Sequence, residues 1–373
     1  MRRRLAVLAA FVCAATSPAL QASEPVSLYD EDGWLDISKF LDTAHGFLPI
    51  VAPITEPAVG YGAAAALVFI DREAPGQWGE RSRPNIAVIG GLGTENGTRG
   101  VFAGHLGTWQ QGRLRTLAAV ADADVNLEFF GFGGNRTPGD RGIDYSIEAR
   151  GGVVGGNYRI GASPWWVGAR YALAQTGVAP GATLPGVVPG DFDLRLAAFT
   201  PQITLDMRDN FFTPTRGWYV DLSMPLFREA LGGDRDFEKL TLTAMHFRPL
   251  SESVFLNLRG SVKDSSDDTP FFLRPFVALR GVQALGYQGK QAAELEAELR
   301  WQFHPRFSAV GFGGAGRARG GGPGTQESDV TTLGAGFRYL IARTYGLHMG
   351  VDVAFGPDDP AIYVVVGNAW MRP

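Results

Sequence analysis

The chain has 373 residues, a formal net charge of −4, 19% charged residues, 11% aromatic residues and one cysteine. This acidic balance argues against nucleic acid as a partner, because nucleic-acid binding depends on basic side chains that neutralise phosphates. A single cysteine, Cys13, excludes a disulfide framework and a cysteine-ligated metal site. We therefore expect no nucleic acid partner and no cofactor.

Residues 1–22 have the pattern of a secretory signal peptide. Three arginines, Arg2 to Arg4, precede an apolar run from Leu5 to Ala15, and small residues end the segment at Ala22. The apolar run is too short to cross the ~30 Å hydrocarbon core of a bilayer. Its removal would also remove Cys13 and change the formal charge from −4 to −7. We therefore expect an exported, cysteine-free mature chain.

Residues 23–54 are expected to form a periplasmic N-terminal segment that contains one short helix. Trp34, Ile37, Leu41 and Ala44 recur at the spacing of one helical face. This helix could lie in the periplasm or plug the lumen of a barrel, and a linker without regular structure is the alternative.

The remaining residues, 55–373, alternate between apolar and polar side chains with a period of two. In residues 294–303, leucine, alanine, tryptophan and phenylalanine alternate with three glutamates, an arginine and a glutamine. The same alternation occurs in 218–226, 254–263 and 345–355. The polar face mixes both charge signs with many glycines, and aromatic residues mark the strand ends, which is typical of a membrane barrel with a wet lumen. We predict an all-β, transmembrane antiparallel β-barrel in the outer membrane of a Gram-negative bacterium.

Turn-forming residues divide this region into strands. In a barrel, short turns face the periplasm and long loops face outward. The pattern counts fifteen strands, but two periplasmic ends require an even number, so a strand is miscounted around 45–57 or 122–142. We predict sixteen strands, with fourteen as the alternative. Short turns are expected at Glu95–Thr98, Gln110–Gly112, Gly161–Pro164, Asn210–Gly217, Pro249–Ser253, His304–Arg306 and Ala342–Gly346, and long loops at 71–84, 131–142, 178–191, 228–236, 264–291 and 317–328.

The glycines of residues 310–320 contain the spacing G-x-G-x-x-G, which in other proteins marks a dinucleotide site. That site needs a helix directly after the glycines, because the helix N-terminus helps to hold the pyrophosphate. Residues 317–329 contain four glycines and a proline, so no helix can follow. The glycines therefore need another explanation.

Several segments, in chain order, resemble the barrel domain of the BamA/TamA superfamily of outer-membrane insertases and secretion pores. Residues 205–227 resemble its periplasmic turn motif, 270–289 its long sixth extracellular loop, and 297–318 the two strands that follow that loop. Residues 362–370 are similar to its closing strand. The residues that match the turn motif are Asp206, Arg208, Asp209, Pro214 and Gly217; those that match the closing strand, where the resemblance implies an assembly signal, are Gly367 and Trp370.

The resemblance implies that loop 264–291 folds into the lumen and is anchored there by Arg280. We expect Glu298 to be the partner of Arg280, with Glu296 as the second choice, because the acid that the family has in its glycine-rich strand is Gly314 here. We expect Trp370 to face lipid at the periplasmic rim. The implied loop anchor also includes Gly281, Tyr287 and Arg300, and the glycines that leave room for the loop are Gly311, Gly313, Gly314 and Gly316.

The resemblance also implies a role in envelope biogenesis, by insertion or translocation of protein or lipid. The implied partners are outer-membrane lipid and lipopolysaccharide, the barrel assembly machinery during biogenesis, and an unfolded protein or a lipid as substrate. Residues 23–54 leave no room for the polypeptide-transport-associated domains of family insertases, so we expect these to be lacking.

Two alternatives remain: a passive pore for small solutes and, less favoured, an outer-membrane hydrolase. The five histidines form no H-E-x-x-H motif, and no G-x-S-x-G motif occurs. His348 and Asp352 lie four residues apart on one strand face, ~13 Å, which is too far for a direct pair. We expect both to be solvated lumen residues, and we expect no enzymatic activity.

Overall fold

The computed structural model describes residues 28–43, 46–71, 85–131, 142–184, 187, 192–320 and 327–370. The predicted signal peptide lies outside the described residues. No helix in the described part of the chain is both long enough and apolar enough to cross a membrane. The chain is built almost entirely of β-strands, which confirms the predicted all-β class.

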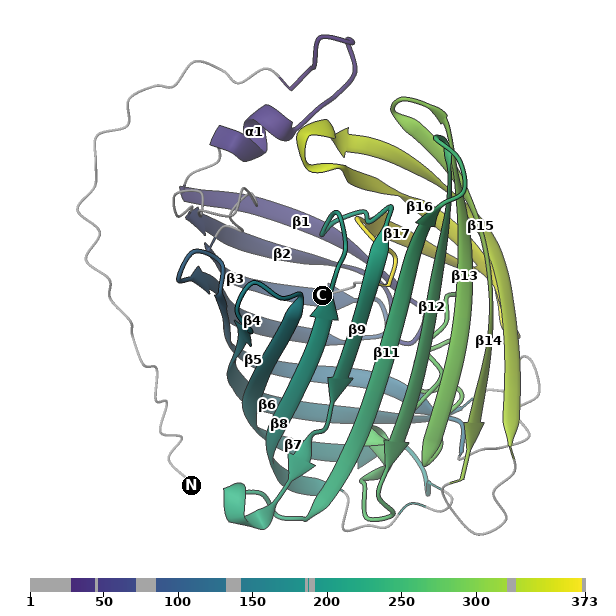
Figure 1. Ribbon diagram of the computed structural model, residues 1–373. Coiled ribbons are helices and arrows are strands. Elements are labelled where there is room, and N and C mark those ends of the chain that lie inside the picture. Colours follow the sequence, from purple (N-terminus) through teal and green to yellow (C-terminus); the bar gives the residue numbers. More distant parts are fainter. Residues whose placement is uncertain are drawn as a thin grey trace.

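Among the described residues, seventeen antiparallel strands form one sheet that curls around an interior (Figure 1). In chain order the strands are β1 (Gly46–Glu56), β2 (Gly60–Asp71), β3 (Asn85–Thr94), β4 (Arg99–Trp109), β5 (Leu114–Phe129), β6 (Ile143–Arg159), β7 (Trp165–Pro180), β8 (Asp193–Asp206), β9 (Gly217–Ser223), β10 (Leu226–Phe227), β11 (Phe237–Pro249), β12 (Val254–Ser265), β13 (Gln291–His304), β14 (Phe307–Arg319), β15 (Ser328–Ala342), β16 (Leu347–Phe355) and β17 (Ala361–Val366). The helices are α1 (Ser38–Thr43) and the 3₁₀ turns η2 (Glu229–Leu231), η3 (Phe271–Leu273) and η4 (Arg343–Tyr345).

Strands β9 and β10 are two halves of one strand. Both pair with β8 on one side and with β11 on the other. The interruption falls at Met224 and Pro225, where the proline has no N–H to donate to a ladder. Counted in this way, the sheet contains the sixteen strands that the sequence predicts.

The strand that the sequence reading missed is β1. It pairs along its whole length with β2, so the boundary of the barrel lies before Gly46 and not between residues 54 and 55. Pro49 and Pro53 obscured this strand, because proline is normally excluded from the middle of a sheet. Alternate residues of a strand point their N–H groups to the same neighbour, so both missing donors fall on one edge of β1.

The position of β1 also moves an early turn to the other end of the barrel. The prediction that Glu95–Thr98 faces the periplasm is wrong. Glu95 exchanges hydrogen bonds with Tyr61 beside the β1–β2 turn, with N to O at 2.8 Å and N to Oε1 at 3.1 Å. It also lines one cavity together with Gly281 of the long loop after β12. The predicted loop at 71–84 lies almost wholly outside the described residues.

The exposure of the strands is the reverse of that in a water-soluble protein. On β13, Leu295 and Trp301 are 59% and 55% exposed, whereas Glu296 is 1% exposed. Soluble proteins bury leucine and expose glutamate, since burial of apolar surface stabilises their core. An apolar outer face with a polar interior is the arrangement expected for strands that cross a membrane.

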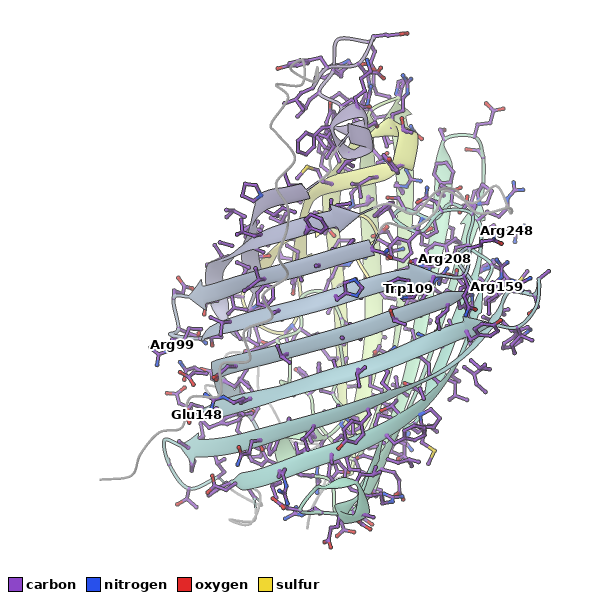
Figure 2. The ribbon with its side chains drawn as sticks, turned by 90° about the vertical axis from the view of Figure 1, so that its left-hand side faces the viewer. Arg99, Trp109, Glu148, Arg159, Arg208 and Arg248 are labelled. Atoms are coloured by element: carbon purple, nitrogen blue, oxygen red, sulfur yellow. The ribbon has the colours of Figure 1, made fainter. Side chains whose placement is uncertain are left out.

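Charged side chains lie toward the two ends of the outer wall. Figure 2 shows Arg99 and Glu148 at one edge of the β3–β8 wall and Arg159 at the other. Between them, exposed apolar side chains occupy the outward face; on β7 these are Val167, Tyr171 and Leu173. The wall therefore has an apolar band with a charged rim on each side.

Where the sheet meets itself, β1 lies beside β17. No antiparallel ladder joins these two strands in the described structure, unlike every other neighbouring pair. A hydrogen bond from Val364 N to Thr55 Oγ1, 3.4 Å long, connects them. Strand β17 has six residues, whereas β6 has seventeen. We call this junction the seam.

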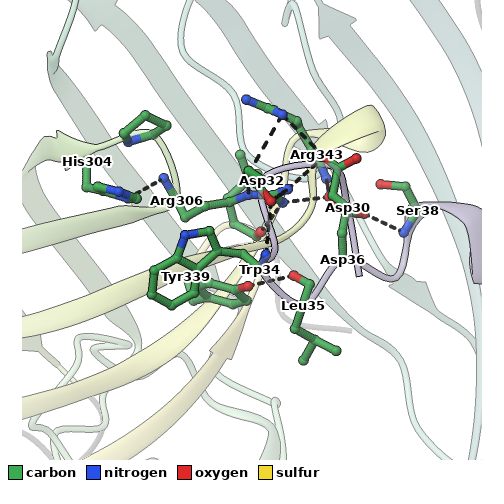
Figure 3. A network of polar contacts seen from close by, with 12 residues as sticks. Asp30, Asp32, Trp34, Leu35, Asp36, Ser38, His304, Arg306, Tyr339 and Arg343 are labelled. Carbon is green, nitrogen blue, oxygen red and sulfur yellow. Dashed lines mark hydrogen bonds and ion pairs between the residues drawn. The ribbon is translucent and has the colours of Figure 1, made fainter. Parts of the chain in front are cut away.

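Residues 28–43, which we call the strap, dock on the end of β13–β16 that carries their short turns, which we call the periplasmic end after the orientation that the sequence predicts. The guanidinium of Arg306, in the β13–β14 turn, binds three aspartates: Asp30 at 2.8 Å, Asp32 at 2.6 Å and Asp36 at 2.6 Å (Figure 3). Tyr339 donates a hydrogen bond to the carbonyl of Leu35 at 2.6 Å. We call Arg306 and these three aspartates the clasp, and through it the strap is a fixed part of the barrel rim.

The predicted helix is present but shorter than its apolar spacing suggests. Helix α1 covers Ser38–Thr43, so Trp34 precedes it, and Ala44 lies outside the described residues. It lies beside η4, where Ile37 and Leu41 pack against a cluster that contains Ile341. The helix thus lies at the periplasmic end and does not plug the lumen.

Acid should release the strap only at very low pH. Burial alone would raise the pKa of the Asp36 carboxyl, but hydrogen bonds from Ser38 and Arg306 lower it from 3.8 to about 2. A lowered pKa stabilises docking above the unfolded value and loses this effect as pH falls through the folded value. We expect a fluorophore on Glu31→Cys, in a Cys13→Ala background, to keep high anisotropy down to about pH 4 and to lose it toward about pH 2. The same label on Ala162→Cys should not change, and release near pH 5 would contradict the clasp.

Candidate functional site in the barrel lumen

The tip of the loop between β12 and β13 carries a buried arginine. Arg280 is 3% exposed, and its guanidinium lies 3.6 Å from the ring centroid of Phe312. Its Nε donates to Glu296 at 2.8 Å, and Nη1 donates to Glu298 at 2.8 Å and to Asp352 at 2.7 Å. One guanidinium is thus shared by three carboxylates from β13 and β16. We call these four residues the lumen cluster.

The carboxylates of the lumen cluster have three further side-chain partners within the described residues, and one of them is Asn257 of β12, whose Nδ2 donates to Glu298 at 3.3 Å. Arg338 of β15 donates through Nη2 to Asp352 at 2.9 Å and lies 3.8 Å from Glu298. The indole Nε1 of Trp370 donates to Glu296 Oε1 at 2.7 Å. Buried carboxylates are costly unless each is paired and hydrogen-bonded. The second arginine, the amide and the indole therefore supply the donors that a single guanidinium lacks.

The sequence reading placed Asp352 and His348 in solvent, and this is wrong. Both are buried: Asp352 is part of the lumen cluster, and His348 Nε2 lies 3.4 Å from Arg300 Nη1. The alternation of residues 345–355 identified their face correctly. It carried no signal that β15 and β16 would bring Arg338 and Arg280 to the same carboxylate.

The backbone of the loop tip contacts the last hairpin. Gly281 has φ of 86°, a conformation that favours glycine, and its N–H donates to the hydroxyl of Tyr363 on β17 at 2.9 Å. A Cβ atom on Gly356, in the β16–β17 turn, would lie 1.9 Å from the carbonyl oxygen of Gly281. The loop is therefore packed directly against the strand that borders the seam.

Two of the four predicted glycines lie beneath the loop. A Cβ on Gly314 would lie 2.9 Å from Leu279 Cδ2, and one on Gly316 would lie 2.3 Å from Val277 Cγ1. The prediction is wrong for Gly311 and Gly313. A Cβ on Gly311 would meet nothing within 4 Å, and one on Gly313 would contact only a neighbouring strand. Alternate residues face opposite sides of a sheet, so these two glycines face outward.

The remaining predicted anchor residues are Tyr287 and Arg300, which lie in different surroundings. Tyr287 is buried in an apolar group with Val277, Leu279 and Val282, so it packs the base of the loop. The Arg300 guanidinium lies 4.3 Å from the Phe255 ring centroid and beside His348. It makes no hydrogen bond to Arg280 in the described contacts but interacts electrostatically with Glu298, so its place in the anchor stays a prediction.

The C-terminal residues turn into the lumen. Gly367 has φ of 74° and donates its N–H to the carbonyl of His348 at 2.7 Å. The chain reverses there, and Trp370 reaches Glu296 and packs 6.3 Å from Phe247. The expectation that Trp370 faces lipid is wrong, because the turn at Gly367 ends the alternation that would have set its direction.

The turn motif of residues 206–217 is held together by ion pairs and hydrogen bonds within the turn. Asp206 binds Arg208 at 2.8 Å, and Asp209 accepts hydrogen bonds from the N–H groups of Thr215 and Arg216 at 2.9 and 3.1 Å. Pro214 is buried, and a Cβ on Gly217 would lie 2.1 Å from the carbonyl of Met207. Phe212 of this turn lies against Gly367, where a Cβ would be 2.8 Å from its carbonyl oxygen. The motif therefore supports the C-terminal turn.

The described residues contain no group of three or more metal-ligating side chains. The histidine on β16 contacts an arginine and the carbonyl of Gly346, which is not the arrangement of a nucleophile and its base. The geometry instead holds a loop and a chain terminus inside a barrel. These features define an outer-membrane β-barrel protein with an in-folded extracellular loop.

Residues 170–357, about half of the chain, match the Omp85 superfamily domain, and the chain belongs to that superfamily. No curated protein is a match in sequence. The chain is similar in fold to BamA from Haemophilus ducreyi lacking POTRA domains 1–3, with a TM-score of 0.59, 10% identity, and coverage of 87% of this chain and 70% of that one.

It is also similar in fold to CdiB from Escherichia coli (TM-score 0.55, 13% identity, 87% of this chain and 60% of that one). CdiB from Acinetobacter baumannii matches with a TM-score of 0.56 and 9% identity over 86% of this chain and 59% of that one. The chain thus spans about 60% of the length of the two CdiB structures.

Removing either Arg280 or Glu298, which form an ion pair, should loosen the loop between β12 and β13. We expect Arg280→Ala and Glu298→Ala each to cost about 3–5 kcal/mol, because the partner charges stay buried. The double variant should lose little more stability than either single variant. Limited proteolysis of the loop and denaturant midpoints measure this. Arg317→Ala, which removes an exposed arginine paired with Asp329, is the control and should change neither quantity. Full additivity of the two changes would exclude direct coupling.

The indole hydrogen bond of Trp370 should contribute to barrel stability. Trp370→Phe keeps an aromatic ring but removes the donor to the buried Glu296 carboxylate. Hydrogen bonds to charged groups contribute about 1.5–3 kcal/mol, so the unfolding midpoint should fall accordingly. Trp301→Phe, on the outward face, is the matched control. Equal midpoints for the two variants would show that the terminal indole acts only by packing.

Proposed function

We propose that this protein inserts or translocates protein or lipid at the seam between β1 and β17. The observation that carries the proposal is the seam itself, which has no backbone ladder in the described structure and is bordered by a strand of six residues. Strand edges without partners can pair with an incoming strand.

The lumen contents support this proposal over a passive pore. The loop after β12 places a buried apolar group and the lumen cluster inside the barrel. Its tip contacts β17 through Tyr363, so loop position and seam position are linked. A channel for small solutes would instead need an open, wet passage along the axis.

Membership of the Omp85 superfamily and the likeness in fold to BamA agree with a role in envelope biogenesis. The partners that we propose are outer-membrane lipid and lipopolysaccharide, the barrel assembly machinery that folds this chain, and an unfolded protein or a lipid as substrate. We propose no enzymatic activity and no cofactor.

A disulfide across the seam should abolish activity. We expect the protein in lipid vesicles to accelerate the folding of a urea-denatured eight-stranded barrel, measured by its heat-dependent gel shift. Oxidised Thr55→Cys/Val364→Cys should reduce folding to the protein-free rate, because the strands can no longer part, and reduction should restore it.

The matched control is a disulfide between β17 and β16, the strand with which β17 already forms an antiparallel ladder. Met349→Cys/Val366→Cys joins a register pair of β16 and β17 and should leave activity unchanged. If the oxidised Thr55→Cys/Val364→Cys protein, which we call the seam-locked protein, still accelerates folding of the substrate barrel, the proposal is contradicted. Steady conductance in planar bilayers that is unaffected by the lock would favour the pore.

A further inference from the structure

The first half of the strap is a small hairpin with two chemically different faces. Tyr29 and Leu35 form an antiparallel bridge, and Asp36 N donates to the carbonyl of Leu28 at 2.7 Å. Asp30 N donates to the carbonyl of Trp34 at 3.0 Å. We call residues 28–36 the strap hairpin.

One face of the strap hairpin grips the barrel. The Arg306 side chain is fully buried by the three aspartates, and Arg343 adds a second guanidinium at 3.2 Å from Asp30. The hydrogen bonds that Arg306 donates to Asp32 and Asp36 raise the pKa of its guanidinium, and the contact with Asp32 is the largest cause. This charged face fixes the height of the hairpin on the rim.

The opposite face carries the bridged pair Tyr29 and Leu35, which are exposed, whereas Trp34 is paired with Asp30 and lies on the side of the aspartates. Trp34 is 43% exposed and Leu35 is 38% exposed, and Leu28 and Tyr29 are exposed beside them. Four large apolar side chains are thus exposed within nine residues, and so much exposed apolar surface usually marks contact with a partner or a membrane.

The residues next to these apolar side chains indicate that their partner is lipid. Trp34 packs edge-on against Phe307, with ring centroids 5.0 Å apart. Phe307 lies on the outward face of β14, because the next residue, Ser308, pairs with the lumen residue Arg338. The rings of Phe307 and Phe337 are 5.5 Å apart, and Phe337 is exposed on the lipid-facing wall.

The same row of rings continues across the wall. Phe303 lies 6.5 Å from Phe307, and Trp301 lies 5.6 Å from Phe303. Such rows form the aromatic girdles that sit at the headgroup level of a bilayer. Trp34 therefore extends a girdle of the barrel wall, although it belongs to a segment outside the sheet.

We propose that the strap hairpin is a lipid-contacting element, whose Trp34 and Leu35 enter the interfacial region of the periplasmic leaflet while the ion pairs of Arg306 with the three aspartates hold the hairpin on the rim. The partner of the exposed apolar side chains is thus lipid of the membrane that the barrel spans. The hairpin widens the girdle over β13–β15 and sets the depth of that rim in the bilayer. This role does not depend on what the seam transports.

Site-specific quenching tests the proposal. The protein carries an environment-sensitive fluorophore on Leu35→Cys in the Cys13→Ala background, in phosphatidylethanolamine/phosphatidylglycerol vesicles with brominated acyl chains. Leu299→Cys, in the outward apolar band, is the positive control, and Ala162→Cys, in an exposed turn at the same end, is the negative control. We expect Leu35→Cys to be quenched, most strongly by bromines near the headgroups, and its emission to shift to the blue.

Release of the clasp should remove this signal. Arg306→Ala should reduce quenching at position 35 to the level of Ala162→Cys and leave Leu299→Cys unchanged. Asp32→Asn, which keeps the side-chain shape, should act in the same direction and replaces Arg306→Ala if that variant does not fold. An unquenched label on Leu35→Cys in otherwise native protein would overturn the proposal. So would protection of that label by a second copy of the chain at high protein density.

Discussion

The burial of the Arg280 guanidinium among three carboxylates is the constraint on which the interior depends. A charge removed from water must be paired, and removal of one partner leaves the others uncompensated. The loop can therefore occupy the lumen only with β13, β15 and β16 in one register, since these strands carry Glu296, Glu298, Arg338 and Asp352. The cluster selects one arrangement of the loop and of these strands together.

The same cluster connects the loop to the end of the chain. Glu296 accepts a hydrogen bond from Trp370, and Gly281 donates one to Tyr363. Strand β17 has no ladder with β1 in the described structure, so contacts from the lumen side supply what the seam lacks. A barrel held in this way can remain folded while one junction stays weak.

The periplasmic rim repeats the chemistry of the lumen. Arg306 is surrounded by Asp30, Asp32 and Asp36, and Arg343 supplies additional positive charge, as Arg338 does inside. In both places an arginine from one segment fixes a second segment that is distant in sequence. The lumen cluster fixes a loop, whereas the clasp fixes the strap, with exposed apolar side chains beside the lipid-facing wall.

Local pattern was enough to predict the all-β barrel and the lumen-facing glutamates of β13, because a period of two assigns each side chain to the lumen or to the wall. The number of sixteen strands also needed the requirement that both ends lie on one side, and the in-folded loop with its Arg280 anchor came from the family resemblance. Local pattern could not predict which charges meet. Strand pairing brings Asp352 to Arg280, and the strap reaches Arg306 across about 270 residues of chain. The local pattern also gave wrong predictions where alternation is broken. It missed the strand that contains Pro49 and Pro53, and it placed Trp370 on the lipid side although the left-handed turn at Gly367 directs it inward. Alternation is a local property, whereas these contacts depend on long-range register and on a backbone reversal, which only the tertiary structure decides.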